Sequence, residues 1–414
     1  MQVSVFQFLL LLLVLVWLDF YAYQAINTLL SKSKAPFNKW VNRIYFGQTV
    51  FFIGLVIYLR FYQPGTVNFS FMITAIAMSY IAKLFAIVFV LIDDFRRVMK
   101  WFFQKKKLRI KNQKNSGERI PRSQFLAKTA VIAATLPIAT MSFGIISGAY
   151  DYRIRRRKLY LPNLPKGFDG LKIAQLSDIH SGSFFDKKAV NGGVDMLLSE
   201  KPDLIFFTGD LVNNETKEVS DYFDIFSRVK ADLGVYSTLG NHDYGDYKNW
   251  TSAAAKLQNL SDMHEVHRRL GWNLLLNENK SLELSGDKIS LIGVENWGAG
   301  RFAKYGDLQK AHLNSEGDVK LLLSHDPSHW DQQVRPNFSD IDLMFAGHTH
   351  GMQLGVEIGD YRWSPSKYIY KQWADLYTQG KHHLYVNRGY GFLGFPGRIG
   401  IYPEITMLEL HRQT

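Results

Sequence analysis

The sequence contains no cysteine among its 414 residues. This absence excludes a disulfide framework, and it also excludes any metal site built from thiolates. It does not decide the compartment, because a chain without cysteine is compatible with either side of a membrane.

Acidic residues are scarce in the first part of the chain. Residues 1–150 hold 4 Asp or Glu against 18 Lys or Arg, whereas residues 151–414 hold 33 against 31. The net charge of +12 therefore belongs to the N-terminal part. A nucleic-acid-binding domain is expected to carry a clustered basic face, so we expect no nucleic-acid partner for the C-terminal part.

Long apolar runs, in contrast, are abundant in the same N-terminal part. They cover residues 3–18, 45–59, 69–92 and 129–150. A helix of about twenty apolar residues spans a hydrocarbon core of ~30 Å, so residues 1–150 are predicted to form a bundle of about four transmembrane helices. The second run is short for a full span, and the fourth contains Pro137. We expect Asp19, which follows the first run, at the membrane interface.

The loop charges predict the orientation of these spans. The first and third loops are basic, with Lys105, Lys106 and Lys107 in the third, whereas the second loop holds only Arg60. Basic loops stay in the cytoplasm, which leaves both termini outside and the C-terminal domain extracytoplasmic, at the inner membrane of a bacterium. The basic strip from Arg153 to Lys158 follows the fourth span and disagrees with this orientation. It either forms the solvated face of a strand or attracts anionic lipid headgroups.

From residue 171 onward, short β-rich runs alternate with longer mixed stretches, two of which (186–199 and 220–229) have helical patterning. Several runs are continuously apolar, as in strands buried on both faces, and ligands gather beyond the carboxyl ends of such strands. The chain is therefore predicted to be α/β. The expected strands are 171–176, 203–207, 234–238, 289–294, 320–323, 341–345, 383–386 and 404–410, with 153–161 as an opening strand.

Five polar motifs each follow one of these runs. Aspartate and histidine are suitable ligands for Mn, Fe and Zn, and a carboxylate can bridge two ions ~3.5–4 Å apart. The glycines at 209, 240 and 347 fit tight turns where backbone passes close to a metal or substrate. The motifs are Leu176-Ser177-Asp178-Ile179-His180, Thr208-Gly209-Asp210, Gly240-Asn241-His242-Asp243, Ser324-His325-Asp326 and Gly347-His348-Thr349-His350.

This ordered set resembles the calcineurin-like metallophosphoesterase family, and within it the membrane-anchored bacterial branch, over residues 153–410. The resemblance implies a four-layer α-β-β-α sandwich over 151–414, preceded by the transmembrane region. It also implies two divalent metal ions, which Mn, Fe or Zn would fit. Their ligands would be Asp178, His180 and His350 for the first, Asn241, His325 and His348 for the second, and Asp210 as the bridge.

The resemblance further implies that a hydroxide bridging the metals attacks phosphorus in line. Asp210 and His242 would be catalytic, with His242 contacting the phosphoryl group together with Asn241 and protonating the leaving oxygen. Arg388 would contact substrate phosphate or, alternatively, brace its loop. Asp243 and Asp326 could orient ligand histidines, although Asp326 could equally cap a following turn.

The sequence therefore predicts a membrane-tethered phosphohydrolase that cleaves phosphodiester or pyrophosphate bonds. Its substrate would be a phosphorylated small molecule or a lipid-linked one. The alternatives are a phosphomonoesterase acting on soluble substrates and a non-catalytic metal-binding scaffold. A group of aromatic residues near the C-terminus could be core material or an exposed patch suited to acyl chains; it comprises Tyr368, Tyr370, Trp373, Tyr377, Tyr390 and Phe392.

Overall fold

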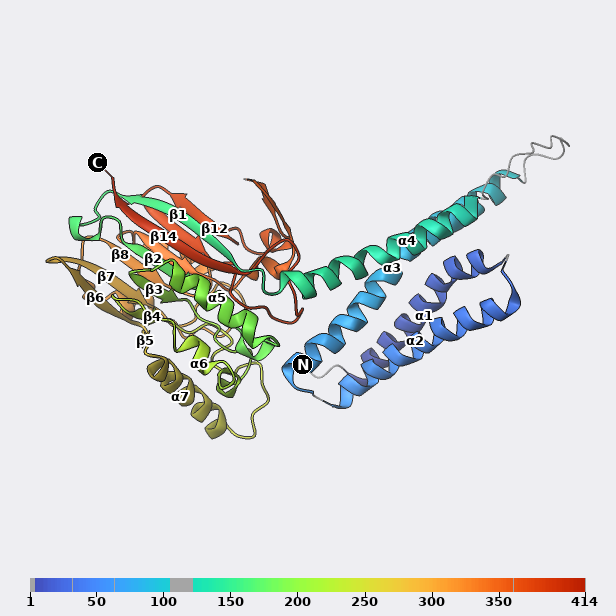
Figure 1. The fold of residues 1–414 in the computed structure, drawn as a ribbon, viewed down its shortest axis with the longest axis horizontal. Coiled ribbons are helices and arrows are strands. Elements are labelled where there is room, and N and C mark those ends of the chain that lie inside the picture. The colour runs from blue at the N-terminus through green and yellow to red at the C-terminus, as the bar shows by residue number, and fades with distance from the viewer. Residues whose placement is uncertain (1–3, 32, 63, 105–121, 360, 414) are drawn as a thin grey trace. The chain divides into compact units, whose positions relative to one another are not determined.

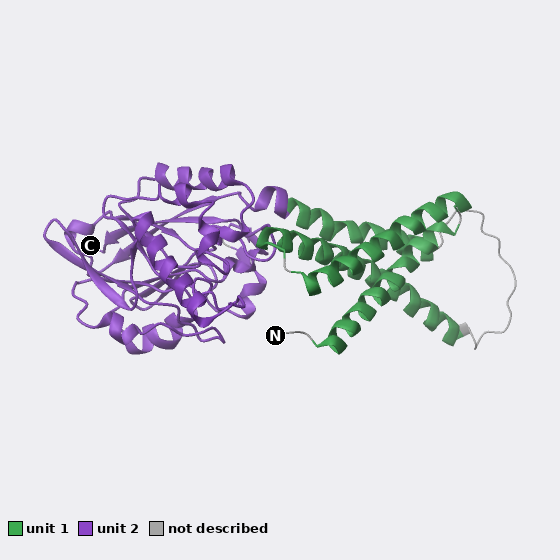
Figure 2. Ribbon diagram, turned by 90° about the horizontal axis from the view of Figure 1, so that it is seen from below, with its two compact units in different colours: residues 1–143 green, residues 144–414 purple. Residues whose placement is uncertain are grey.

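The computed structural model describes residues 4–31, 33–62, 64–104, 122–359 and 361–413. The chain divides into two compact units, Met1–Phe143 and Gly144–Thr414 (Figure 2). The predicted boundary lies slightly later, after residue 150, and the difference has a local cause. The Gly144 carbonyl accepts a hydrogen bond from the Arg398 backbone at 3.1 Å, which ties this turn to the second unit. Residues 105–121 of the predicted basic linker, 105–122, lie outside the described residues.

The first unit is helical. Its helices are α1 (Val5–Leu30), α2 (Ala35–Phe61), α3 (Thr66–Gln104) and α4 (Arg122–Phe143), and a π-helical turn, η1 (Gly144–Gly148), continues α4 into the second unit. Among the described residues, four helices are long and apolar enough to cross a membrane. The prediction of about four spans is therefore confirmed. The first three helices are longer than their apolar runs because polar residues extend their ends, whereas α4 begins earlier than its run and is followed by η1.

Asp19, which the sequence places just after the first apolar run, is buried against α3. Since α1 continues to Leu30, position 19 falls in its interior, where the Asp19 carboxylate lies 2.5 Å from the Lys83 ammonium of α3. The hydroxyl of Tyr80 donates to the same carboxylate at 3.0 Å. Both charges are buried, and pairing lowers the large cost of placing either one in a lipid-embedded bundle.

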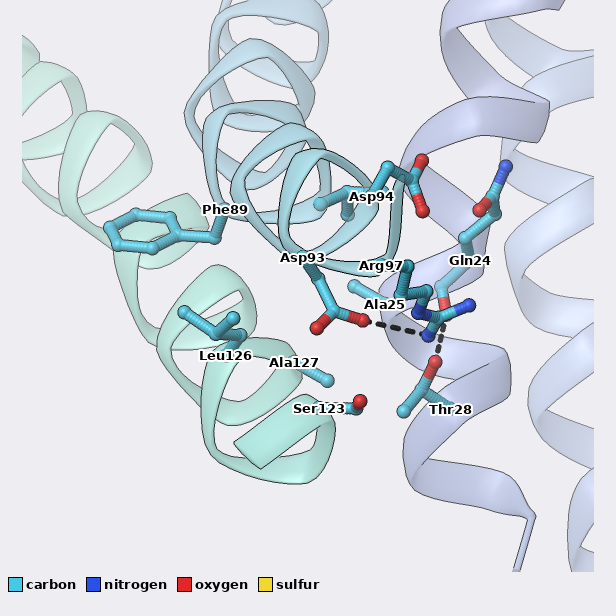
Figure 3. Close-up of a pocket in the computed structure, with 11 residues that line it drawn as sticks. Gln24, Ala25, Thr28, Phe89, Asp93, Asp94, Arg97, Ser123, Leu126 and Ala127 are labelled. Carbon is cyan, nitrogen blue, oxygen red and sulfur yellow. Dashed lines mark hydrogen bonds and ion pairs between the residues drawn. The ribbon is translucent and has the colours of Figure 1, made fainter. Parts of the chain in front are cut away.

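A small cavity lies between α1, α3 and α4 (Figure 3). The Asp93 carboxylate on its wall pairs with the Arg97 guanidinium at 2.7 Å, as the dashed line in Figure 3 shows. The charged groups of the wall therefore largely compensate one another. The lining residues are Gln24, Ala25, Thr28, Phe89, Val90, Asp93, Asp94, Arg97, Ser123, Leu126 and Ala127.

The second unit is built on two six-stranded sheets (Figure 1). The first has the order β1 (Arg153–Leu161), β14 (Glu404–Arg412), β2 (Lys172–Leu176), β3 (Leu204–Phe207), β4 (Val235–Ser237) and β5 (Asn273–Leu274). The second has the order β12 (Asp375–Gln379), β13 (His382–Val386), β9 (Leu343–Ala346), β8 (Lys320–Leu323), β7 (Asp287–Gly293) and β6 (Glu278–Leu284). Within the first sheet β2, β3 and β4 run parallel, and in the second β7, β8, β9 and β13 do.

The two sheets pack face to face, and alternate residues of each strand point to opposite sides. Ile173 and Phe206 belong to the core between the sheets, together with Leu321 and Phe345. The outer face of the first sheet is covered by α5 (Lys187–Ser199) and α7 (Ala253–Leu270), and that of the second by α8 (Leu308–His312) with the turns near Trp330. The predicted four-layer sandwich is confirmed.

Short elements complete the unit. The predicted helix over 220–229 contracts to α6 (Phe223–Phe226). A two-stranded hairpin that the sequence did not suggest, β10 (Val356–Ile358) and β11 (Tyr361–Trp363), stands apart from both sheets. The remaining turns are η2 (Lys166–Phe168), η3 (Ser181–Ser183), η4 (Thr216–Val219), η5 (Trp330–Val334), α9 (Arg335–Asn337), η6 (His350–Gln353) and η7 (Pro365–Tyr368).

Candidate metal centre

The five motifs converge from both sheets. Each follows a strand directly: the first three follow β2, β3 and β4, and the last two follow β8 and β9. Because the carboxyl ends of parallel strands meet at one edge of a sheet, polar side chains at these ends are brought together. Backbone hydrogen bonds link the loops, as the Asp178 N–H donates to the Gly209 carbonyl at 2.9 Å and the Gly347 N–H to the His325 carbonyl at 2.9 Å.

One group of ligand atoms comes from the β2 and β9 loops. His350 Nε2 lies 3.2 Å from Asp178 Oδ1 and 3.0 Å from His180 Nε2. The three donor atoms all lie within 4.8 Å of one another, close enough for one ion. They are the residues predicted for the first metal.

A second group of ligand atoms lies around Asp210. His325 Nε2 lies 3.1 Å from Asp210 Oδ2 and 3.2 Å from His348 Nδ1, and these donor atoms also fall within 4.8 Å of one another. Asp210 Oδ2 is in addition 3.6 Å from His180 Nε2 of the first group. Its carboxylate therefore reaches both groups, which is the geometry required of a bridging ligand.

Asn241 supports the fit of a metal in a different way. Its amide nitrogen donates to the Tyr247 hydroxyl at 2.8 Å, while its Oδ1 atom is buried and has no hydrogen-bond partner among the described residues. A buried amide oxygen without a donor is costly and calls for an explanation such as a bound ion. The neutral oxygen ligand predicted for the second metal is thus available.

The backbone at the centre is strained. Asp178, Asp210 and His348 have φ angles of 51°, 60° and 70°, in the left-handed region that residues other than glycine rarely adopt. His180 and His350 lie in the same region. Such strain persists only where the surrounding structure imposes it, and it is concentrated at functional sites.

Two of the motif glycines are required by close approach. A Cβ atom on Gly240 would collide with the carboxylate of Asp210, and one on Gly347 would collide with that of Asp178. Any side chain at either position would push a ligand out of place. The tight turns expected at these two glycines are therefore present, with a ligand carboxylate as the close neighbour.

Hydrogen bonds outside the centre fix which histidine nitrogen faces inward. The His325 Nδ1–H donates to the Thr208 carbonyl at 2.7 Å, which directs Nε2 toward Asp210. Burial opposes protonation of this ring, but the Asp210 carboxylate outweighs it and raises the pKa of His325 to about 10. Burial also disfavours the charged form of Asp210, which would raise its pKa. The neighbouring His325 and His242 outweigh burial and hold the pKa of Asp210 well below the ordinary value. A cation bound at these ligands would displace the proton that this high pKa favours on His325.

His242 is oriented toward the centre without belonging to either ligand group. Its backbone N–H donates to Asp210 Oδ1 at 2.9 Å, and its Nδ1–H donates to the Asn213 carbonyl at 2.7 Å. These two bonds leave Nε2 as the nitrogen available to a substrate. The contact with Asn213 uses a backbone carbonyl, which no sequence motif reveals.

Asp243 does not orient a histidine, contrary to the prediction. Its carboxylate accepts the backbone N–H groups of Asp210 and Gly240, both at 2.9 Å, and those of Leu211 and Val212. It is buried between the two loops and joins them. Asp243 therefore positions the bridging ligand through the backbone.

Both alternatives for Asp326 have some basis. Its Oδ1 accepts the Ser328 N–H at 2.8 Å, which caps the following turn, while Oδ2 is 3.7 Å from His348 Nε2. The closer partner of that nitrogen is the Tyr370 hydroxyl, at 2.7 Å. Tyr370 thus orients His348, and the sequence offered only its place in an aromatic group as a signal.

The contacts of Arg388 favour bracing over phosphate binding. Its guanidinium is buried, lying 2.5 Å from Glu404, 2.6 Å from Glu357 and 3.5 Å from Asp375. These carboxylates engage the donors that a phosphate would need. Of the two alternatives that the sequence left open, these contacts favour bracing: Arg388 joins its loop to β14 through Glu404 and to the β10–β11 hairpin through Glu357.

Comparison with known proteins agrees with this geometry. Residues 171–352 match the family model described as "Calcineurin-like phosphoesterase", and residues 4–149 match "Probable Calcineurin-like phosphoesterase, transmembrane domain". The chain is 30% identical over 251 residues to the uncharacterized metallophosphoesterase YkuE of Bacillus subtilis, covering 60% of this chain and 81% of YkuE. It belongs to the calcineurin-like metallophosphoesterase family.

Two further relatives extend the comparison. Phosphodiesterase YaeI of Escherichia coli is 28% identical over 70% of this chain and 99% of its own length. A transmembrane protein with metallophosphoesterase domain from Danio rerio is 28% identical over 68% of this chain, and the match spans 63% of that relative. The family binds divalent metals, and the two ligand groups described above are the candidate sites in this chain.

Proposed function

We propose that this protein is a membrane-tethered phosphohydrolase that uses two divalent metals to cleave phosphodiester or pyrophosphate bonds. The observation that carries the proposal is the Asp210 carboxylate, which reaches both ligand groups. When bound, two such ions would stabilise charge on the phosphoryl oxygens and make water nucleophilic at neutral pH. The Mn, Fe and Zn ions all suit this set of ligands.

The chain's own residues supply positioning and proton transfer. The backbone of Asn213 holds the His242 ring so that Nε2 can carry a proton to the leaving oxygen. The loop that Asp243 fixes keeps Asp210 in its strained conformation. The Tyr370 hydroxyl orients His348, so that Nδ1 faces the other ligands of its group.

Cleavage of a diester is favoured by the relative YaeI, which is named a phosphodiesterase. A lipid-linked substrate fits four spans that keep the domain near a bilayer. The alternative is a phosphomonoesterase acting on soluble substrates, which the same ligand set would also support.

We further propose that the metal-binding domain is extracytoplasmic, because the first and third loops are basic. The cysteine-free chain makes this testable with one introduced thiol. Leu257 is exposed on α7, so Leu257→Cys should react with a membrane-impermeant maleimide in intact cells. Labelling that appears only after lysis would place the domain in the cytoplasm.

The activity is tested on the full chain in detergent, stripped with a chelator and reloaded with Mn²⁺ or Zn²⁺. Hydrolysis of bis(p-nitrophenyl) phosphate is expected to disappear on chelation and to return with the metal, because the bound ions would make water nucleophilic and stabilise charge on the phosphoryl oxygens. A faster rate on p-nitrophenyl phosphate would instead favour the monoesterase alternative. Two metals bound per chain with no turnover of either ester, or of a pyrophosphate, would favour the scaffold.

A further inference from the structure

The β10–β11 hairpin has an apolar face that points away from the protein. Val356 pairs with Trp363 and Ile358 with Tyr361, so these four side chains share one face. Ile358 is 73% exposed and Tyr361 is 63% exposed. A two-stranded ribbon in water normally buries its apolar face, so this arrangement needs a reason.

The opposite face of the hairpin is charged and packed against the domain. Glu357 pairs with Arg155 and with the buried Arg388, and Arg362 lies 3.1 Å from Asp375. Antiparallel strands at an aqueous surface usually turn apolar residues inward and polar residues outward. In this hairpin the apolar residues face outward, whereas the charged residues face the domain and are held there by ion pairs. The outward face therefore suits a non-aqueous partner.

Further exposed apolar residues lie in the segments that precede and follow the hairpin in the chain. Leu354 is exposed just before β10, and Tyr368 and Ile369 at the end of η7 are 73% and 67% exposed. Basic side chains border these residues, with the Lys367 ammonium 5.3 Å from the Tyr368 ring and Lys371 largely exposed. We refer to these exposed apolar residues together as the hairpin patch: Leu354, Val356, Ile358, Tyr361, Tyr368 and Ile369.

Backbone hydrogen bonds connect the hairpin patch to the end of the fourth candidate span, Ser123–Gly148. The last turn of that span, η1, accepts the Arg398 N–H through the Gly144 carbonyl at 3.1 Å. The next residue, Ile399, donates to the Gln353 carbonyl at 2.7 Å and accepts the Gly355 N–H at 2.8 Å. Gly355 directly precedes β10, so these hydrogen bonds place the start of the hairpin close to the end of the candidate span.

We propose that the hairpin patch inserts into the membrane–water interface of the bilayer that holds the four spans. Tyrosine rings and lysine side chains are characteristic of that interface, and the bordering lysines would favour anionic headgroups. The partner is thus a lipid surface, and the proposal holds whichever bond the enzyme cleaves. Ile369 immediately precedes Tyr370, whose hydroxyl contacts His348, so the insertion would place this side of the metal centre at the lipid surface.

The test uses the full chain in vesicles of phosphatidylethanolamine and phosphatidylglycerol. Single nitroxide labels are attached at Ile358→Cys and Tyr368→Cys, with Leu257→Cys as a matched control because Leu257 is an apolar residue, 68% exposed, on α7. Electron paramagnetic resonance then compares collisions with oxygen, which concentrates in lipid, and with a water-soluble nickel chelate. We expect the first two labels to favour oxygen several-fold relative to the control.

Three outcomes decide the proposal. The proposal would be overturned if the labels at 358 and 368 collided with the nickel chelate as often as the label at 257 does. It would also be overturned by spin–spin broadening that vanishes when the labelled protein is diluted with unlabelled chain. That second result would assign the patch to contact with a second copy of the chain. Ile358→Asp in the Tyr368→Cys background is expected to return the label to water, whereas Leu257→Asp in the same background is not. None of these measurements depends on activity, so failure of the proposed function would leave the test intact.

Discussion

Asp210→Asn is expected to lower metal-dependent turnover of bis(p-nitrophenyl) phosphate by about 10²–10³-fold, as for removal of a preorganised electrostatic group in other enzymes. The carboxylate reaches both ligand groups, and a neutral amide cannot bridge two cations in the same way. We therefore expect the variant to bind fewer than two metals per chain. Turnover measured beside metal analysis of the purified full chain checks both expectations.

His242→Gln is the contrasting variant. His242 belongs to neither ligand group. The metal content of the variant should therefore stay unchanged while its kcat falls by about 10²–10⁴-fold, the usual contribution of a general acid. His264→Gln, a change on α7 away from the motifs, should alter neither quantity. Full activity of Asp210→Asn with two metals bound would contradict the bridging role.

The predicted strands with the clearest sequence signal are those with continuous apolar runs. β2, β3, β8 and β9 are buried on both faces, so composition alone identifies them. The elements that were missed lack this signal. β6, for example, has the polar sequence Glu278–Leu284 and pairs only with β7 at the edge of its sheet.

The candidate ligands could be predicted because their chemistry lies in local motifs. Their supporting partners could not, because those contacts join distant segments. Tyr370 meets His348 across an irregular loop, and Asn213 holds His242 with a backbone carbonyl. The Asp19–Lys83 pair was hidden for a related reason, since polar residues that extend α1 concealed its true length.

The buried cation at Arg388 is the second position where a large effect is expected. Its guanidinium lies among Glu404, Glu357 and Asp375, and Glu404 also accepts the Tyr385 hydroxyl at 2.6 Å. Removing one partner of a buried ion pair leaves an uncompensated charge, which costs about 3–5 kcal/mol. Arg388→Met should therefore lower the Tm of the second unit by roughly 10 °C, at about 2–4 °C per kcal/mol for a domain of this size.

Thermal melting of the full chain in detergent, with metals bound, checks this expectation. Arg153→Met is the matched control, because Arg153 pairs with Asp151 at an exposed position where such a pair contributes at most about 1 kcal/mol. Adding Glu404→Gln to Arg388→Met should restore part of the lost stability, since the uncompensated carboxylate is then removed. An Arg388 that bound substrate phosphate would give the opposite result: an unchanged Tm and a raised KM.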